Sequence, residues 1–314
     1  MRGEIESFYF ERYSYRSDMK ELNICGKKVF IFANHAVAPR AWLRLGKNSP
    51  LNLITFDEHS DTHSPLLVYR NTCLGRSDDR LLELLDKIKE ELSDETLAKL
   101  VEPGAYLKMT KYKTSTAGKL CLRMWNDEHI TTSMYLGIIK KAYVCSPSAD
   151  RGKKELYRSE LISLHDRILY LDKAFRENGT GFGVNNESYS QEDDSLGYYD
   201  INNIGNKRIA ELFREGLKVS EPYVLDIDAD YFNNLGVLEK TQKEYDEFAK
   251  IVQNAEGITI ATEPTYVDEA SERYNRQIEK YNKRCLLEKK KLHRVWNSQD
   301  VLDRLLIIIK QSLL

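Results

Sequence analysis

Two acids and a histidine alternate along the segment LITFDEHSDTHSP, residues 53–65. Asp57, His59 and Asp61 are separated by single residues, so an extended backbone can direct all three side chains to one side. Carboxylates and imidazoles that share a side can bind a divalent cation. The chain has six histidines in all, and this segment contains two of them. Taken alone, the segment is compatible with half of a metal site or with a polar surface turn.

Residues of the same chemical types follow other apolar runs. His35 comes shortly after KKVFIF, and Glu263 comes shortly after GITIA. The segment LDIDADYF carries Asp226 and Asp228 on one side of an extended chain. In an open α/β sheet ligands bind outside the carboxyl ends of the strands, and carboxylates buried there are costly without a cation. We therefore predict a metal site with the ligands His35, Asp57, His59, Asp61, Asp226 and Asp228.

The predicted ligands suit a pair of ions. A single ion takes about four to six ligands, whereas two imidazoles and four carboxylates, some of them bridging, can hold two hard or borderline ions. Manganese is favoured because a carboxylate-rich set with some imidazole suits it better than metals that prefer thiolates. Two ions roughly 3.5–4 Å apart can hold a hydroxide nucleophile at neutral pH. The predicted cofactor is therefore two Mn²⁺ ions in a hydrolase.

The strands that must position these side chains are predicted from short apolar runs that end in polar residues. Such runs are typical of a parallel sheet covered by helices. Amphipathic patterns between them predict helices, and strand alternating with helix predicts an α/β fold. The predicted strands are 27–32, 51–56, 140–145, 167–171, 222–227 and 257–261, and the predicted helices are 78–101, 131–143, 206–217, 239–255 and one at the C-terminus.

The chain is expected to form one domain over residues 1–314 with two additions. Residues 177–200 are rich in Gly, Asn, Ser and acids, which predicts a long loop insertion. Residues 269–294 are highly charged and predicted to be helical. This charged segment is either a solvated helix face or a surface that binds an acidic peptide or partner.

The composition excludes several classes of protein. Lys and Arg number 47 and Asp and Glu number 49, a net charge of −2 that points neither to nucleic acid nor to a membrane partner. The five cysteines are scattered and form no CxxC pair, which is typical of a reduced, cytoplasmic protein. The N-terminus lacks the apolar region of a secretory signal. We expect a cytoplasmic protein, and a homo-oligomer is possible.

The motifs DEHSD and DIDAD resemble the DxHxD and DxD metal motifs of the ureohydrolases, the arginase and agmatinase superfamily. The chain is more similar to a divergent arginase-like branch that includes the peptide arginases. Those enzymes convert arginine to ornithine within ribosomally made precursor peptides. The shared features extend over roughly residues 28–264 and are NHAVAPRAW with His35 and Trp42, FDEHSDTHSP, NDEHI at 126–130, LDIDADYF, and TIATEP at 259–264.

The resemblance implies a three-layer αβα arginase-like fold with a mainly parallel sheet and a binuclear manganese site. It implies that Asp57 and Asp226 bridge the ions, that His35 and Asp61 complete one site, and that His59 and Asp228 complete the other. A bridging hydroxide would attack the guanidinium carbon, with Asp61 orienting it and handling its proton. Glu263 would hydrogen-bond the guanidinium. The products would be urea and an ornithine side chain, and the partner would be a precursor peptide.

Two features mark where the chain departs from enzymes that act on free arginine. His63 stands where those arginases carry an asparagine that recognises the amino-acid end of the substrate. A peptide-bound arginine lacks a free α-carboxylate, so this change fits a peptide substrate. The histidine that usually shuttles protons has no obvious counterpart, and His63 or His129 could serve. Glu128 and His129 either contact substrate or begin a helix that Asn126 or Asp127 caps.

Three alternatives to a peptide arginase remain. The first is a ureohydrolase acting on free arginine, agmatine or another small guanidino compound. The second is a zinc deacetylase-like amidohydrolase. Enzymes of that type use one metal and place paired histidines beside it, and no two histidines are adjacent here. The third is a binding protein without turnover, which would be expected to have lost ligands, whereas all six ligand positions are intact.

Overall fold

The computed structural model describes residues 19–47, 49–57, 61–101, 124–145, 159–165, 167–170, 221–232, 242–264, 267–268, 272, 275–276 and 297–314. The expected loop at 177–200 and the predicted helix at 206–217 lie outside these residues. The charged segment 269–294 lies outside them except for residues 272, 275 and 276. In the described part of the chain, no helix is both long and apolar enough to cross a membrane.

A seven-stranded sheet forms the centre of the protein, in the order β1-β2-β7-β6-β3-β4-β5. β1 pairs antiparallel with β2, and every other pair of neighbours is parallel. The predicted mainly parallel α/β architecture is therefore confirmed. The strands are β1 (Met19–Ile24), β2 (Lys27–Phe32), β3 (Leu51–Phe56), β4 (Ile139–Cys145), β5 (Ile168–Tyr170), β6 (Tyr223–Asp228) and β7 (Gly257–Ala261).

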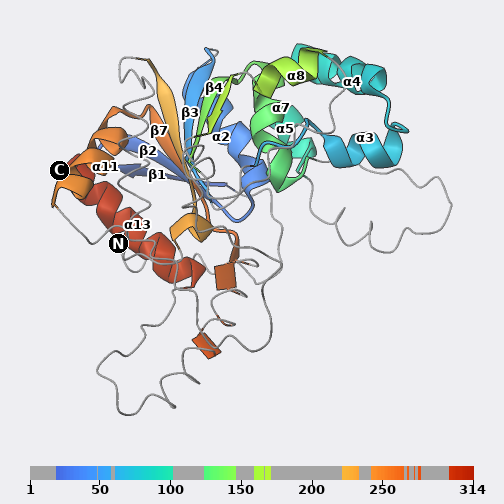
Figure 1. Cartoon of the computed structure of the whole chain (residues 1–314). Helices are drawn as coiled ribbons and strands as arrows, with labels where there is room; N and C mark the ends of the chain where they lie inside the picture. The colour runs from blue at the N-terminus through green and yellow to red at the C-terminus, as the bar shows by residue number, and fades with distance from the viewer. Residues whose placement is uncertain are drawn as a thin grey trace, which may run out of the picture.

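Helices cover both faces of the sheet (Figure 1). Side chains of β2 and β3 alternate between two apolar clusters, with Phe30 and Leu53 in one and Ile31 and Ile54 in the other. The first cluster includes side chains of α2 (Ala38–Gly46), α4 (Asp78–Glu90), α5 (Asp94–Lys99), α7 (His129–Leu136) and α8 (Ser159–His165). The second includes side chains of α11 (Gln242–Asn254) and α13 (Ser298–Leu313). The near-continuous apolar strands follow from burial on both faces.

Two predicted helices are shorter than expected. The predicted helix 78–101 is divided into α4 and α5, because Ser93 begins a new helix by accepting a hydrogen bond from the Thr96 N–H at 3.1 Å. The predicted helix 131–143 is wrong beyond Leu136. Gly137 there adopts a left-handed conformation with φ 79°, which ends α7 before β4 begins. The helices α2 and α3 (Leu67–Cys73), the helix α8 and the strand β1 were not predicted.

Short turns follow the strands that carry the predicted site. The 3-10 turn η2 (His35–Val37) comes soon after β2, and Asn34 caps it by accepting a hydrogen bond from the Ala36 N–H at 2.9 Å. The turn η6 (Ala229–Phe232) follows β6 directly. A third turn, η3 (Asn126–Glu128), leads into α7. Because β2, β7, β6 and β3 are neighbours in the sheet, their carboxyl ends meet at one edge.

Candidate metal centre

Acidic and histidine side chains gather at that edge of the sheet. His35 follows β2, Asp57 and Asp61 follow β3, Asp226 and Asp228 end β6, and Glu263 follows β7. Each of these side chains is buried, with exposures from 0% for His35 and Asp226 to 6% for Glu263. Ionised groups are rarely buried in such number without compensation. The predicted convergence at the strand ends is therefore present among the described residues.

The imidazole of His35 lies at the middle of this cluster. Its Nδ1 atom is 3.1 Å from Asp228 Oδ2, 3.3 Å from Asp61 Oδ2 and 3.4 Å from Asp57 Oδ2. This buried Nδ1 atom makes no hydrogen bond. On the other side of the ring, Nε2 lies 2.7 Å from Asp226 Oδ2. One ring nitrogen therefore faces three carboxylates, and the other contacts one.

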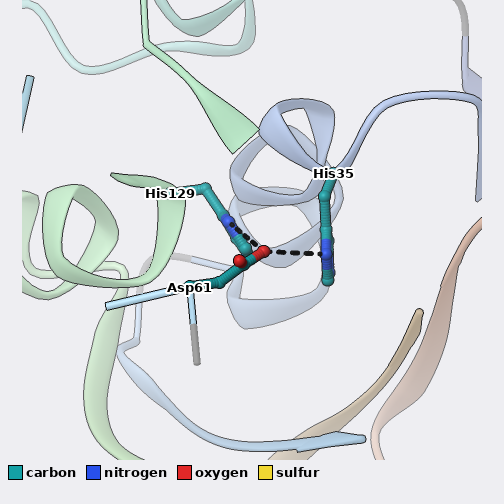
Figure 2. Close-up of side chains that lie close together, drawn as sticks. All are labelled: His35, Asp61 and His129. Atoms are coloured by element: carbon teal, nitrogen blue, oxygen red, sulfur yellow. Dashed lines mark ion pairs between the residues drawn. The ribbon is translucent and has the colours of Figure 1, made fainter. Parts of the chain in front are cut away.

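A second imidazole belongs to the cluster. His129 is the first residue of α7 and is fully buried, and its ring centroid lies 4.1 Å from that of His35. Figure 2 shows the carboxylate of Asp61 between the two rings, with Oδ2 3.3 Å from His35 Nδ1 and 3.6 Å from His129 Nδ1. Two groups of buried side chains could each hold a metal ion: His35, Asp61 and His129, and His35, Asp57 and Asp228.

Burial and mutual repulsion perturb the acids strongly. Burial raises the pKa of Asp57 and of Asp228 well above the usual range, and the charges of neighbouring acids raise both further. Burial also raises the pKa of Glu263 to about 7. Burial alone would raise the pKa of Asp226, but the charge and hydrogen bond of His35 outweigh it and lower that pKa. Burial lowers the pKa of His35, but the surrounding carboxylates outweigh it and raise that pKa well above its usual value.

The charges of the cluster fit divalent cations. Five buried carboxylates (Asp57, Asp61, Asp226, Asp228 and Glu263) outnumber the two imidazoles, so with all five ionised even two protonated histidines would leave excess negative charge. Carboxylate oxygens accept hydrogen bonds but donate none, so three of them around one ring nitrogen need a proton or a metal ion between them. Oxygen-rich sets with some imidazole suit manganese and similar ions. The residues present therefore fit the predicted metal.

The backbone is strained at two of these residues. Asp61 has φ 47° and Glu263 has φ 37°, in the left-handed region that residues other than glycine seldom adopt. Strain of this kind costs roughly 1–3 kcal/mol and persists where the surroundings fix the conformation. The main chain of Glu263 is fixed by a hydrogen bond from its N–H to Ala33 O at 3.1 Å. The strain accompanies the inward placement of both carboxylates.

Three residues that were not predicted as part of the site support Asp226. Thr55 and Thr259 occupy the positions beside Asp226 on the two flanking strands, and each donates a hydrogen bond to its carboxylate. Trp42 in α2 donates from Nε1 to Thr259 Oγ1 at 3.2 Å. The sequence contains one signal of this role, because both threonines are polar interruptions in otherwise apolar buried runs.

The predicted site residues His63 and Glu128 belong to neither of the two groups that could hold a metal ion. His63 is only partly buried, and its Nδ1 lies 4.0 Å from Asp127 Oδ2. Glu128 is fully buried and accepts a hydrogen bond from the Trp125 N–H at 3.0 Å, so this acid, rather than Asn126 or Asp127, caps the turn before α7. His59 lies outside the described residues. Its predicted role as a ligand stays a prediction.

Fold and site together define an α/β protein with a buried group of histidines and aspartates that could bind metal. Comparisons with models of known protein families, with curated proteins and with solved structures found no match to this chain. The assignment of a reaction therefore depends on the geometry of the site and on the resemblance of its motifs.

Proposed function

We propose that the protein is a binuclear manganese hydrolase that converts arginine side chains of a peptide to ornithine and releases urea. The observation that carries this proposal is the position of the His35 Nδ1 atom, which faces Asp57, Asp61 and Asp228 within 3.4 Å. A ring nitrogen without a hydrogen bond among three buried carboxylates is the arrangement that a metal ion would complete. The choice of reaction is based on the order of the motifs along the chain, which resembles that of the peptide arginases.

The metal would be held mainly by His35, Asp57, Asp61 and Asp228, with His59 contributing as the resemblance implies. When bound, two divalent ions supply an activated water and polarise the atom under attack. Both the carboxylates and the imidazole are compatible with manganese. A zinc deacetylase-like site would instead bind one ion, so the metal content distinguishes the two.

The surrounding residues have separate roles in this proposal. Glu263 would accept hydrogen bonds from the guanidinium, since a buried carboxylate is a suitable partner for a planar cation. Asp61 would hold the proton of the attacking water, and His129, 3.6 Å from Asp61, would pass a proton to the departing amine. His63 and Glu128 are proposed to line the substrate side of the site.

Peptide-bound arginine is the proposed substrate because His63 replaces the asparagine that recognises the end of a free amino acid. A peptide has no α-carboxylate to be recognised at that position. The alternative substrates are free arginine, agmatine or another small guanidino compound. Both classes would undergo the same hydrolysis, in which water is consumed, the guanidino carbon leaves in urea and a primary amine remains.

Mass spectrometry tests the proposal. Protein loaded with Mn²⁺ and incubated with arginine-containing peptides is expected to lower the peptide mass by about 42 Da for each residue hydrolysed, and to release one urea. Asp61→Asn and chelator-treated protein serve as inactive controls. Urea released from free arginine or agmatine, with unchanged peptides, would assign a small-molecule ureohydrolase. Unchanged peptides and no urea from any of these compounds would refute the proposed reaction.

A further inference from the structure

We infer that Asp228 is the metal ligand of the LDIDADYF segment, and that Asp226 is a positioning residue that holds His35 by its Nε2 atom. This ligand set differs from the one implied by the resemblance, in which Asp226 bridges the two ions and Asp228 is the second ligand. It depends on the proposed metal centre, but it does not depend on the substrate.

Protein donors occupy both oxygens of the Asp226 carboxylate. Oδ1 accepts a hydrogen bond from Thr259 Oγ1 at 2.5 Å. Oδ2 accepts one from Thr55 Oγ1 at 2.9 Å and lies 2.7 Å from His35 Nε2. A carboxylate that bridges two ions has to direct one oxygen to each of them. The fully buried Asp226 directs both to the protein instead, and it belongs to neither of the two groups that could hold an ion.

The register of the sheet produces this arrangement. Thr55 on β3, Asp226 on β6 and Thr259 on β7 are direct neighbours across three parallel strands. Side chains at equivalent positions of neighbouring strands point to the same face, so the two hydroxyls flank the carboxylate. Threonine also suits the strands through its branched side chain. The three residues therefore form a fixed row on the face covered by α2.

Trp42 determines the direction of the hydrogen bonds in this row. An indole N–H can only donate, and Trp42 Nε1 donates to Thr259 Oγ1 at 3.2 Å. The hydroxyl proton of Thr259 is consequently left for Asp226, whose ionised carboxylate can only accept. All of these side chains are fully buried, so water does not compete. Asp226 is thus held as an anion in one orientation.

The anion in turn orients His35. A carboxylate beside Nε2 requires the ring proton at that nitrogen, which leaves Nδ1 of the neutral ring as a lone pair. That atom points at Asp228, Asp61 and Asp57. Metal-bound histidines commonly donate their other N–H to a carboxylate, which fixes the tautomer and the ring orientation. Asp226, His35 and the proposed ion fit this arrangement.

Asp228 lies on the side of the ring that faces the proposed ions. Asp228 Oδ2 is 3.1 Å from His35 Nδ1, and its Oδ1 accepts a hydrogen bond from the Asp230 N–H at 3.0 Å. Asp230 lies in η6, where the chain turns away from the strand. Asp228 also belongs, with His35 and Asp57, to one of the two groups that could hold an ion. Asp228, rather than Asp226, would therefore hold an ion together with His35 and Asp57.

Two matched substitutions test this ligand set: Asp226→Asn and Asp228→Asn. Each removes one charge and keeps the shape of the side chain. The readouts are the number of Mn²⁺ ions retained after dialysis and the absorption spectrum with Co²⁺. Asp228→Asn is expected to lose at least one ion. Asp226→Asn is expected to bind two ions about 10- to 100-fold more weakly. Loss of the ions by Asp226→Asn at saturating Mn²⁺, or a wild-type metal content in Asp228→Asn, would overturn the inference.

Thr259 offers a second test, which leaves every carboxylate in place. This test is also available if Asp226→Asn fails to fold. Thr259→Val removes the hydroxyl at nearly constant shape, and Thr259→Ser restores it. Thr259→Val is expected to weaken Mn²⁺ binding up to about tenfold, and Thr259→Ser to bind as the wild-type protein does. Equal metal affinity of Thr259→Val and wild type would contradict a positioning role for Asp226.

Separate measurements of metal binding and of turnover distinguish failure of the ligand set from failure of the proposed reaction. A protein that binds two ions with this pattern, yet changes neither peptides nor small guanidino compounds, would refute the proposed reaction and support the ligand set. A wild-type protein that binds no Mn²⁺ or Co²⁺ would overturn both.

Discussion

The carboxylate of Glu263 accepts a hydrogen bond from the main-chain N–H of His35, with 3.0 Å between Oε1 and N. The two residues are 228 positions apart in the sequence, and the contact joins the carboxyl ends of β7 and β2. The pairing of these strands continues past β7, since the Thr262 N–H donates to Phe32 O at 2.9 Å. The acid proposed to bind substrate and the histidine proposed to bind metal therefore form one rigid unit.

Replacement of Glu263 by glutamine separates its two roles. Glutamine keeps an acceptor for the His35 N–H but loses the charge that would bind a guanidinium. Manganese content is expected to stay at the wild-type value, and kcat/KM for the arginine peptide to fall about 10- to 100-fold, the range for a hydrogen bond to a charged group. Metal analysis and the peptide mass assay measure the two quantities. An unchanged kcat/KM would remove Glu263 from the substrate site.

His129 lies where it can act either on protons or on metal. In the proposed mechanism it passes a proton, so His129→Gln is expected to retain two Mn²⁺ ions while kcat falls at least about 100-fold. His165, whose side chain has no proposed role, provides the matched control as His165→Gln, with expected wild-type turnover. If His129→Gln instead loses an ion, His129 is a ligand of the group that it forms with His35 and Asp61.

Much of this fold can be predicted from local patterns. The bounds of β2, β3 and β7 agree with the predicted runs, because strands buried on both faces are apolar throughout. The edge strand β1 was missed, because its burial alternates and its sequence MKELNI is half polar. The end of α7 depends on Gly137, whose left-handed conformation interrupts an otherwise continuous apolar pattern.

The site is less predictable than the fold, because spacing alone does not show which face of a strand meets which partner. Asp226 and Asp228 share a face in the sequence pattern, and both lie within 3.1 Å of His35, but at opposite ring nitrogens. The distinction comes from Thr55 and Thr259, which only strand order and register bring beside Asp226. Burial of His129 against Trp42, with ring centroids 5.4 Å apart, is likewise a tertiary contact.

Gly257 begins β7 where α2 packs closely on the sheet. A Cβ atom at this position would lie 2.4 Å from Leu45 Cδ2 and 3.1 Å from Leu45 Cγ. Gly257→Ala is therefore expected to destabilise the protein by about 1–3 kcal/mol in urea unfolding, as overpacked cores do. Gly46→Ala is the control, because its Cβ would meet Leu51 Cγ at an ordinary 3.6 Å. In a double-mutant cycle, Gly257→Ala is expected to cost less stability in the Leu45→Ala background than in the wild type. Equal stability of Gly257→Ala and wild type would contradict the close approach.

The stability of the metal-free protein is expected to fall as pH rises, and bound Mn²⁺ is expected to reverse this. The raised pKa values of Asp57, Asp228 and Glu263 mean that the fold retains protons that the unfolded chain releases. The protonated acids stabilise the fold fully below the pKa values of the unfolded chain, which are near 4. This stabilisation is lost as pH rises through the pKa values of the folded protein, about 7 in the case of Glu263. His35 acts in the same direction, since its pKa is also raised.

The pKa of Asp226 is lowered, so this residue stabilises the fold at every pH above the ordinary aspartate pKa. Its contribution is therefore constant between about pH 5 and 8. Metal ions replace the retained protons, so Mn²⁺ should bind more tightly as pH rises. Thermal unfolding with chelator and with saturating Mn²⁺, at intervals from about pH 5.5 to 8, measures both effects. The difference in Tm between the two conditions is expected to widen with pH. A difference that narrows would mean that the raised pKa values do not belong to the groups that bind the metal.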